Sequence, residues 1–206
     1  MLAAFTAGLL LITISELGDK TFFIAMLLAM RHSRRLVFLG VVAALAAMTM
    51  LSVLLGQAAS LLPKLWIHYA EVILFLGFGI KLLYDAKTMT AQTPCGDEVQ
   101  EAQAAIAESA LTLNPSRLQQ GVVLQAFALT FAAEWGDRTQ IATIALAASN
   151  NPWGVTVGAT LGHAICAAIA VIGGRFVSGR LSERTVTLLG GILFLIFGIV
   201  ALVEGA

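Results

Sequence analysis

The sequence predicts an all-α integral membrane protein, in which six transmembrane helices form two inverted repeats of three helices each. Two observations carry this prediction: a strongly apolar composition and a polar motif that occurs twice. Of the 206 residues, 59% are hydrophobic and 12% are charged, whereas a soluble domain carries about 25% charged residues. The net charge is zero, so no nucleic-acid partner is expected.

The first repeat is expected over residues 1–87. Its first apolar run, residues 2–30, is long enough to cross a bilayer, for which about 20 apolar residues suffice. No basic segment precedes this run, so we do not expect it to be a cleaved signal peptide. Two further spans are predicted over residues 36–62, before Pro63, and over residues 69–86, after a short turn at 64–68.

Residues 88–120 form a polar connecting segment, in which residues 97–111 are expected to make a surface helix with a weak apolar stripe. The second repeat is expected over residues 121–206. It begins with a helix over 121–148, and a turn at 149–152 separates this helix from the next one. Helices over 153–177 and 186–203 complete the predicted fold.

The repeat rests on two sequence matches. ELGDKT at residues 16–21 recurs as EWGDRT at 134–139, 118 residues later, and Gly40 recurs at the same offset as Gly158. Residues 73–80 match residues 192–199 at seven of eight positions, at an offset of 119. An odd number of helices per repeat inverts the second copy, as in many secondary transporters. Gly40 and Gly158 are expected to allow close helix contact.

Basic residues are unevenly distributed between the two predicted sides of the membrane. The side of the connecting segment carries Arg31, Arg34, Arg35, Lys81, Lys87, Arg117, Arg175, Arg180 and Arg184, and the other side carries Lys64 alone. The positive-inside rule therefore predicts a multi-pass protein with a cytoplasmic connecting segment and both termini outside.

Both motifs fall near the middle of a predicted span. A charge there costs about 2.5–3.5 kcal/mol if it faces lipid, so these charges are expected to face one another. On a helix, Glu16 and Asp19 share a face, as do Glu134 and Asp137. Four carboxylates can then converge where the repeats meet. The motifs also contain oppositely charged pairs four residues apart, Glu16 with Lys20 and Glu134 with Arg138. Such pairs stabilise a helix, so a purely structural role of the motifs is an alternative.

The other motif residues are expected to support this site. The glycines allow close backbone approach or helix bending, and the other side chains add oxygen groups or positive charge: Gly18, Lys20, Thr21, Gly136, Arg138, Thr139 and Gln140. Oxygen ligands suit Mg²⁺, Ca²⁺ and Mn²⁺ better than zinc or copper. No cofactor is expected, because the metal ion is the cargo.

The formal charges of the two motifs indicate an exchange of a metal ion for protons. Four carboxylates with Lys20 and Arg138 leave a formal charge of −2, which one divalent cation or two protons would cancel. Closely spaced carboxylates in a low-dielectric interior interact strongly, so the site is expected to hold the metal or the protons but not both.

Three further residues are weaker candidates. Trp135 would wall the site or simply pack, His163 would relay protons or be structural, and Glu71 would lie at the outer mouth. A passive divalent-cation channel remains an alternative function. An intramembrane hydrolase using paired carboxylates is disfavoured because no nucleophile–base pair is present, so no enzymatic activity is expected.

The two motifs resemble the doubled E-x-G-D-[KR]-[ST] signature of a family of cation/proton antiporters. It comprises MneA-type bacterial manganese exporters, chloroplast manganese transporters and Golgi manganese/calcium–proton antiporters. The resemblance covers the whole chain and implies export of Mn²⁺ in exchange for protons, with Glu16, Asp19, Glu134 and Asp137 as ligands. Ca²⁺ as the main ion, and a homodimer, are left open. The short N-terminus is similar to that of bacterial members, which implies the inner membrane.

Overall fold

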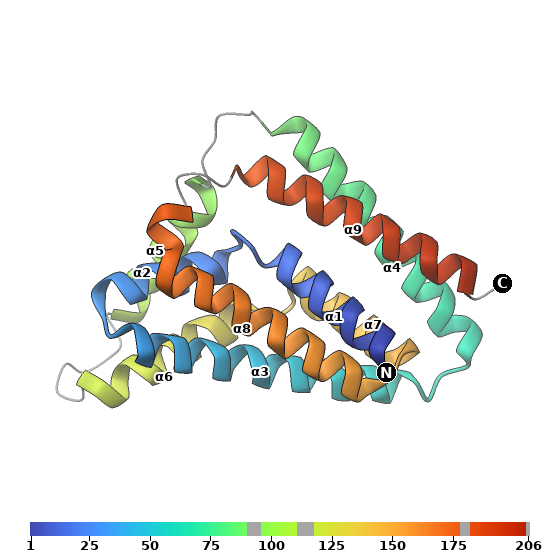
Figure 1. The fold of residues 1–206 in the computed structure, drawn as a ribbon, viewed down its shortest axis with the longest axis horizontal. Helices are drawn as coiled ribbons and strands as arrows, with labels where there is room; N and C mark the ends of the chain where they lie inside the picture. Colours follow the sequence, from blue (N-terminus) through green and yellow to red (C-terminus); the bar gives the residue numbers. More distant parts are fainter. Residues whose placement is uncertain (90–95, 111–117, 178–181, 205–206) are drawn as a thin grey trace.

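The computed structural model describes residues 1–89, 96–110, 118–177 and 182–204. In these parts of the chain the regular elements are all α-helices, which confirms the predicted all-α class (Figure 1). They are α1 (Leu2–Ser15), α2 (Lys20–Arg31), α3 (Arg34–Ala59), α4 (Lys64–Thr88), α5 (Gly96–Ala110), α6 (Leu118–Ala133), α7 (Arg138–Ser149), α8 (Pro152–Val177) and α9 (Glu183–Glu204).

The predicted continuous helices over residues 2–30 and 121–148 are wrong, because each is broken at its motif. The first becomes α1 and α2, which meet at an angle of 66°, and the second becomes α6 and α7. In each break a glycine has a positive φ, a conformation that an α-helix cannot contain. The interruption therefore lies at the polar residues themselves.

The other helix boundaries are close to those predicted, with one exception. The predicted turn at residues 64–68 is wrong, since these residues form the start of α4, directly after Pro63 at its N-cap position. Proline is tolerated where a helix starts, because the first backbone N–H groups have no partner within the helix. The surface helix predicted in the connecting segment is present as α5.

Four described helices are long and apolar enough to cross a membrane: α3, α4, α8 and α9. The bent pair α1–α2 makes a fifth, broken span. In α6 the described apolar stretch, Gly121–Ala133, is shorter. The described residues thus identify a multi-pass membrane protein with four or five candidate spans, rather than the full set of six.

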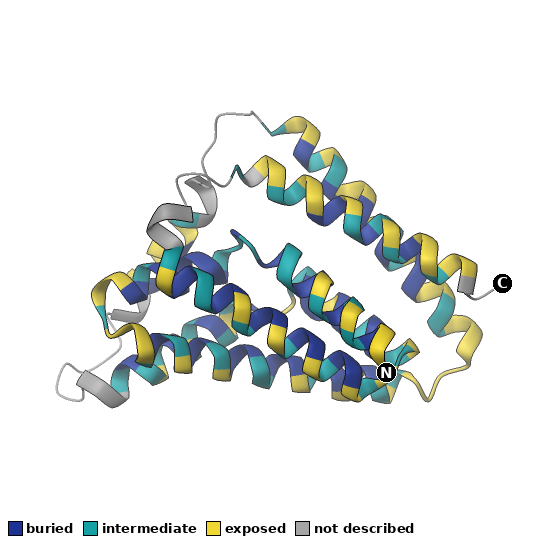
Figure 2. Cartoon of the chain, viewed as in Figure 1, coloured by how far each residue is buried: buried dark blue, intermediate teal, exposed yellow. Residues whose placement is uncertain are grey.

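The helices pack in a core and an outer layer. In the core α3 contacts α8, while α1 and α2 pack on α8 and α6 and α7 pack on α3. The outer layer is formed by α4 and α9, which lie side by side and contact α7 and α1, respectively (Figure 1). Large apolar side chains such as Ile73, Ile80, Ile192 and Ile199 are exposed on this outer pair (Figure 2), as expected of a surface that faces lipid.

Close helix contact at Gly40 and Gly158 is confirmed. A Cβ atom at Gly40 would lie 2.5 Å from the Val123 carbonyl oxygen of α6, and one at Gly158 would collide with the Phe5 carbonyl of α1. Glycines at equivalent positions of α3 and α8 therefore allow close packing of the first half of each broken helix, α6 on α3 and α1 on α8.

Candidate cation-binding site

Both motifs fold into the same helix break. Gly18 has a φ of +81° and Gly136 a φ of +82°, a left-handed conformation that costs other residues roughly 1–2 kcal/mol. After each glycine the chain becomes extended, and Asp19 and Asp137 occupy the N-cap positions of α2 and α7. This backbone geometry gives a physical reason for glycine at the third position of both motifs.

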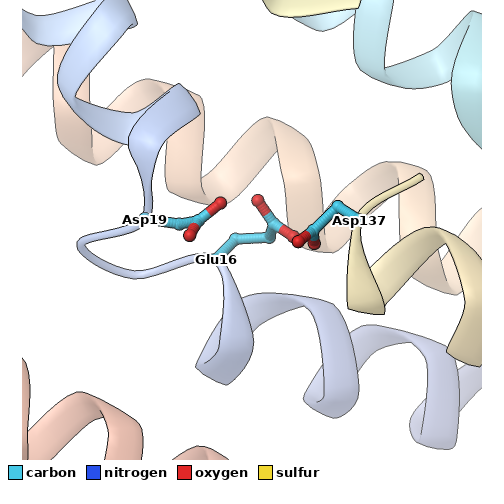
Figure 3. Close-up of side chains that lie close together, drawn as sticks. All are labelled: Glu16, Asp19 and Asp137. Atoms are coloured by element: carbon cyan, nitrogen blue, oxygen red, sulfur yellow. The ribbon is translucent and has the colours of Figure 1, made fainter. Parts of the chain in front are cut away.

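Three of the predicted ligands come together from the two breaks. One carboxylate oxygen from each of Glu16, Asp19 and Asp137 lies within 4.8 Å of the other two (Figure 3). Glu16 is buried, with 2% of its surface exposed, and both aspartates are partly buried. Oxygen atoms this close can share one hard cation such as Mn²⁺, Ca²⁺ or Mg²⁺.

The fourth predicted ligand, Glu134, is buried but does not belong to this group of three. In the described structure one carboxylate oxygen of Glu134 and one of Glu16, the Oε1 atom in each, lack a hydrogen-bond partner. A buried charge without a partner is costly, and binding a cation or a proton would remove that cost.

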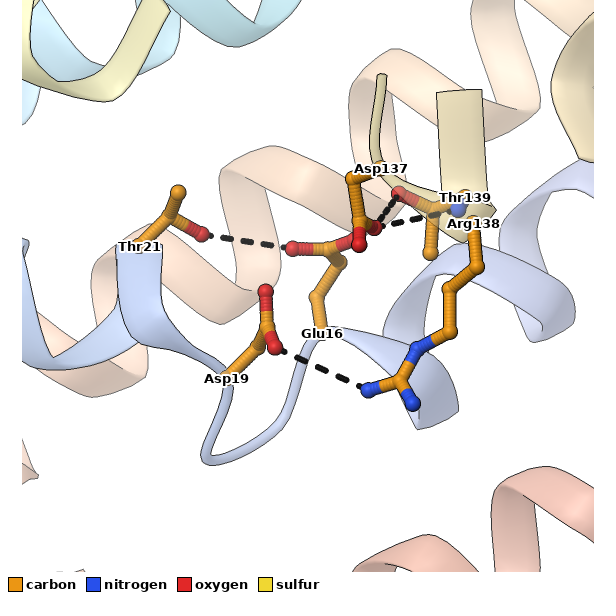
Figure 4. Close-up of polar contacts among 6 residues, drawn as sticks. All are labelled: Glu16, Asp19, Thr21, Asp137, Arg138 and Thr139. Atoms are coloured by element: carbon orange, nitrogen blue, oxygen red, sulfur yellow. Dashed lines mark hydrogen bonds and ion pairs between the residues drawn. The ribbon is translucent and has the colours of Figure 1, made fainter. Parts of the chain in front are cut away.

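The hydroxyls and the arginine of the motifs organise the carboxylates (Figure 4). Thr21 Oγ1 donates to Glu16 at 3.3 Å, whereas Thr139 donates to Asp137 from its backbone N–H at 3.0 Å and from its hydroxyl at 2.8 Å. Arg138 pairs with Asp19 at 3.6 Å. The arginine therefore connects the second motif to the first.

The basic residues do not form the i,i+4 pairs that a continuous helix would allow, because the breaks separate the partners. Lys20 instead pairs with Glu101 of α5 at 3.2 Å, and Arg138 crosses to the other motif. Lys20 therefore links the first motif to the connecting helix, and Arg138 links the second motif to the first.

Gln140 supports the second break rather than the carboxylates. Its Oε1 atom accepts a hydrogen bond from the Gly136 N–H at 2.7 Å, and its Nε2 atom contacts Met48 Sδ at 3.0 Å. The first motif has Phe22 at the equivalent position, which offers no such acceptor. The second break is thus held by an extra hydrogen bond; the sequence showed the difference between the two copies at this position, but not this contact.

A cavity of about 80 Å³, here called the vestibule, leads to Asp19. Its walls are the first break, the start of α7, the end of α4 and the start of α9, through Ser15, Leu17, Gly18, Asp19, Leu82, Asp85, Met89, Arg138, Val186, Thr187 and Gly190. Sequence reasoning missed Asp85. The feature that could have identified Asp85 is its position, since it is an acidic residue near the end of the third predicted helix.

His163 lies beside the site in a second, smaller pocket of about 10 Å³ that Glu16 also lines. The histidine is buried and its Nδ1 atom lacks a hydrogen-bond partner among the described residues. The two other weak candidates line neither cavity. Trp135 is 65% exposed and packs against Phe131, and Glu71 is buried within α4, where it has an interaction of its own.

A family model described as the divalent cation/proton antiporter GDT1 matches residues 4–90 and 122–206. The chain is 64% identical to a GDT1-like protein of Synechocystis sp., over 98% of this chain and 97% of that protein.

Eukaryotic relatives match over similar lengths. GDT1-like protein 5 of Arabidopsis thaliana is 39% identical over 98% of this chain and 96% of its own length. A GDT1-like protein of Schizosaccharomyces pombe is 41% identical over 92% of this chain and 78% of its own length. No solved structure matches the chain.

Proposed function

Since the chain belongs to the GDT1 family of divalent cation/proton antiporters, we propose that it exports Mn²⁺ in exchange for protons, with Ca²⁺ as a second substrate. Members of this family are transporters and not enzymes, which agrees with the lack of enzymatic activity expected from the sequence. The observation that carries the proposal is the cluster of Glu16, Asp19 and Asp137, whose oxygens come from both motifs and lie within 4.8 Å.

In this proposal the three clustered acids bind the metal directly, and Glu134 joins them as the fourth ligand. Glu134 and Glu16 each have a buried oxygen without a hydrogen-bond partner among the described residues. A bound Mn²⁺ would satisfy these oxygens, and protons would satisfy them after the metal leaves. The site is thereby occupied by the metal in one half of the cycle and by protons in the other.

The proposed topology has six spans in two inverted repeats. Two of them are broken, α1–α2 in the first repeat and α6–α7 in the second, and the four continuous helices complete the repeats. Both termini lie outside and residues 88–120 lie in the cytoplasm, as the basic residues indicate. The 64% identity to a cyanobacterial protein favours the inner membrane of a bacterium.

Alternating access would follow from the position of the outer pair. On this topology α1 and α7 are the halves of the broken spans that lie toward the outside of the cell, and α2 and α6 are the halves that lie toward the cytoplasm. The pair α4–α9 contacts α1 and α7, and among the described residues it makes no comparable contact with α2 or α6. The vestibule lies at the end of α4 and the start of α9, so this conformation would be open to the cytoplasm.

Reconstitution into liposomes with an internal pH dye tests the function. Wild-type protein should move Mn²⁺ and, in the opposite direction, protons, and Asp19→Asn should abolish both fluxes. Glu108→Gln, which removes an equal charge from α5, is the matched control and should transport normally. Coupled exchange retained by Asp19→Asn would refute the proposed site, and Mn²⁺ flux without a pH change would identify a passive channel.

A further inference from the structure

Asp85 lies on the wall of the vestibule, outside both motifs. It belongs to the last turn of α4 and is partly exposed, and it shares the cavity with Asp19 and Arg138. The vestibule volume is about 80 Å³, and a water molecule needs roughly 10–15 Å³ measured in this way. The cavity therefore has room for several waters, so a cation can reach Asp85 while it is still hydrated.

Asp85 determines the net charge of the groups that line the vestibule. Arg138 is paired with Asp19 at 3.6 Å, so these two groups together carry no net charge. An approaching cation would meet the positive charge of Arg138, whose side chain is 34% accessible. Asp85 gives the lining a net negative charge, and negative lining of a cleft concentrates cations within it.

Asp85 is available for this role. The ion pairs among the described residues join Lys20 to Glu101 and Arg138 to Asp19, so none of them engages the Asp85 carboxylate. The basic residues of the same helix, Lys81 and Lys87, are exposed and likewise take no part in these pairs. The negative charge of Asp85 thus remains uncompensated at the vestibule wall.

The repeat provides a second, independent observation. Residues 73–80 of α4 match residues 192–199 of α9 at an offset of 119, and the same offset carries Asp85 to Glu204, the last residue of α9. The third helix of each repeat therefore carries an acidic residue in its last turn. Because the proposed repeats are inverted, one of these acids belongs to the cytoplasmic side and the other to the outer side.

We propose that Asp85 recruits the hydrated divalent cation into the vestibule, from which the ion passes to the motif carboxylates. Asp85 acts before the ion is bound and is not one of its final ligands. It sets the apparent affinity on the cytoplasmic side and leaves the turnover of the loaded transporter unchanged. This inference rests on the proposed function.

The test is Mn²⁺ uptake into proteoliposomes in which the transporter is oriented so that Mn²⁺ is supplied to the vestibule side. Asp85→Asn should raise the KM for Mn²⁺ about three- to tenfold, as expected for the loss of one charge a few ångströms from a divalent ion in a water-filled cavity. The maximal rate should stay the same. The increase in KM should shrink at high ionic strength, because salt screens exposed charges.

Two variants complete the design. Asp85→Glu keeps the charge and should restore the wild-type KM, whereas Glu108→Gln removes a cytoplasmic charge elsewhere and should leave the KM unchanged. An unchanged KM in Asp85→Asn, or a loss of maximal rate with normal KM, would overturn the role of Asp85 while wild-type exchange still supports the proposed function. Absence of coupled Mn²⁺ flux in the wild type would overturn the proposed function itself.

Discussion

At Gly136 the backbone is left-handed, and a Cβ atom there would meet no other atom within 4 Å. A substitution at this position therefore changes the backbone energy without causing a collision. Gly136→Ala should lower the free energy of unfolding by about 1–2 kcal/mol, the cost of this conformation for an L-residue. Chemical unfolding of the detergent-solubilised protein measures the change.

Gly121→Ala is the matched control for this prediction. A Cβ atom at Gly121 also meets open space, but the residue lies within α6 and has no positive φ. Alanine is the better helix former, so this substitution should leave stability unchanged or raise it. Equal losses in the two variants would show that the left-handed conformation is not what the glycine provides.

At the proposed site Arg138 would compete with a metal ion for Asp19, since the two side chains are paired at 3.6 Å. Arg138→Gln removes a positive charge next to the carboxylate cluster, so Mn²⁺ should bind more tightly and be released more slowly. Both the KM for Mn²⁺ and the maximal rate should fall. Equilibrium Mn²⁺ binding and transport kinetics measure the two effects.

Arg138→Lys, which keeps the charge, serves as the reference. It should change the affinity less than the glutamine variant does. Weaker Mn²⁺ binding in Arg138→Gln would contradict the competition and would assign to Arg138 the task of holding the empty carboxylates in place.

At the scale of single elements, α5 is held on the core by two kinds of contact. Ala102 and Ile106 are buried against the cluster that α2 and α6 help to form, and Glu101, which is exposed, pairs with the partly exposed Lys20. A solvent-exposed ion pair contributes less than about 1 kcal/mol, whereas truncation of a buried isoleucine to alanine costs about 2–5 kcal/mol. The apolar contact should dominate.

Hydrogen exchange of peptides covering residues 96–110 distinguishes the two contributions. Ile106→Ala should speed exchange in α5 by about thirtyfold or more, which corresponds to the lower end of the cavity cost. Glu101→Gln should speed it by about fivefold or less. A larger effect of Glu101→Gln would mean that the ion pair, rather than the apolar stripe, docks the connecting helix.

The sequence predicted the positions of the apolar segments well, because hydropathy depends on composition averaged over many residues. The same averaging gave two continuous helices, although Gly18 and Gly136 had indicated that the helices could bend at the motifs. The repeated motif correctly indicated that acids from both halves would meet. The bond from Gly136 to Gln140 and the pair between Lys20 and Glu101 could not be predicted, because both depend on tertiary geometry.

At the scale of the whole molecule, the outer pair α4–α9 breaks the symmetry of the repeats. It contacts α1 and α7, whereas the symmetry-related contacts with α6 and α2 are not comparably made among the described residues. Thr187, which lines the vestibule at the start of α9, is a probe of this asymmetry. In a background lacking Cys95 and Cys166, Thr187→Cys should react with a charged, membrane-impermeant thiol reagent from the cytoplasmic side.

Ser60→Cys is the control for sidedness. Ser60 is exposed at the C-terminal end of α3, which lies on the outside of the membrane in the proposed topology. It should react only from the outside. Conditions that drive the transporter to its outward-facing conformation should protect Thr187→Cys and leave Ser60→Cys unchanged. Reaction of Thr187→Cys from the outside alone would contradict both the proposed orientation and the proposed cytoplasmic opening.

The major packing partnerships join helices from different halves of the chain: α1 with α8, α3 with α6 and α7, and α4 with α9. A polypeptide of half this length would leave all of these surfaces uncovered. On the proposed topology, an ancestor before gene duplication would have had to insert in both directions and assemble as an antiparallel pair. Each molecule of that pair would have supplied one helix break, so metal capture would have required assembly from the outset.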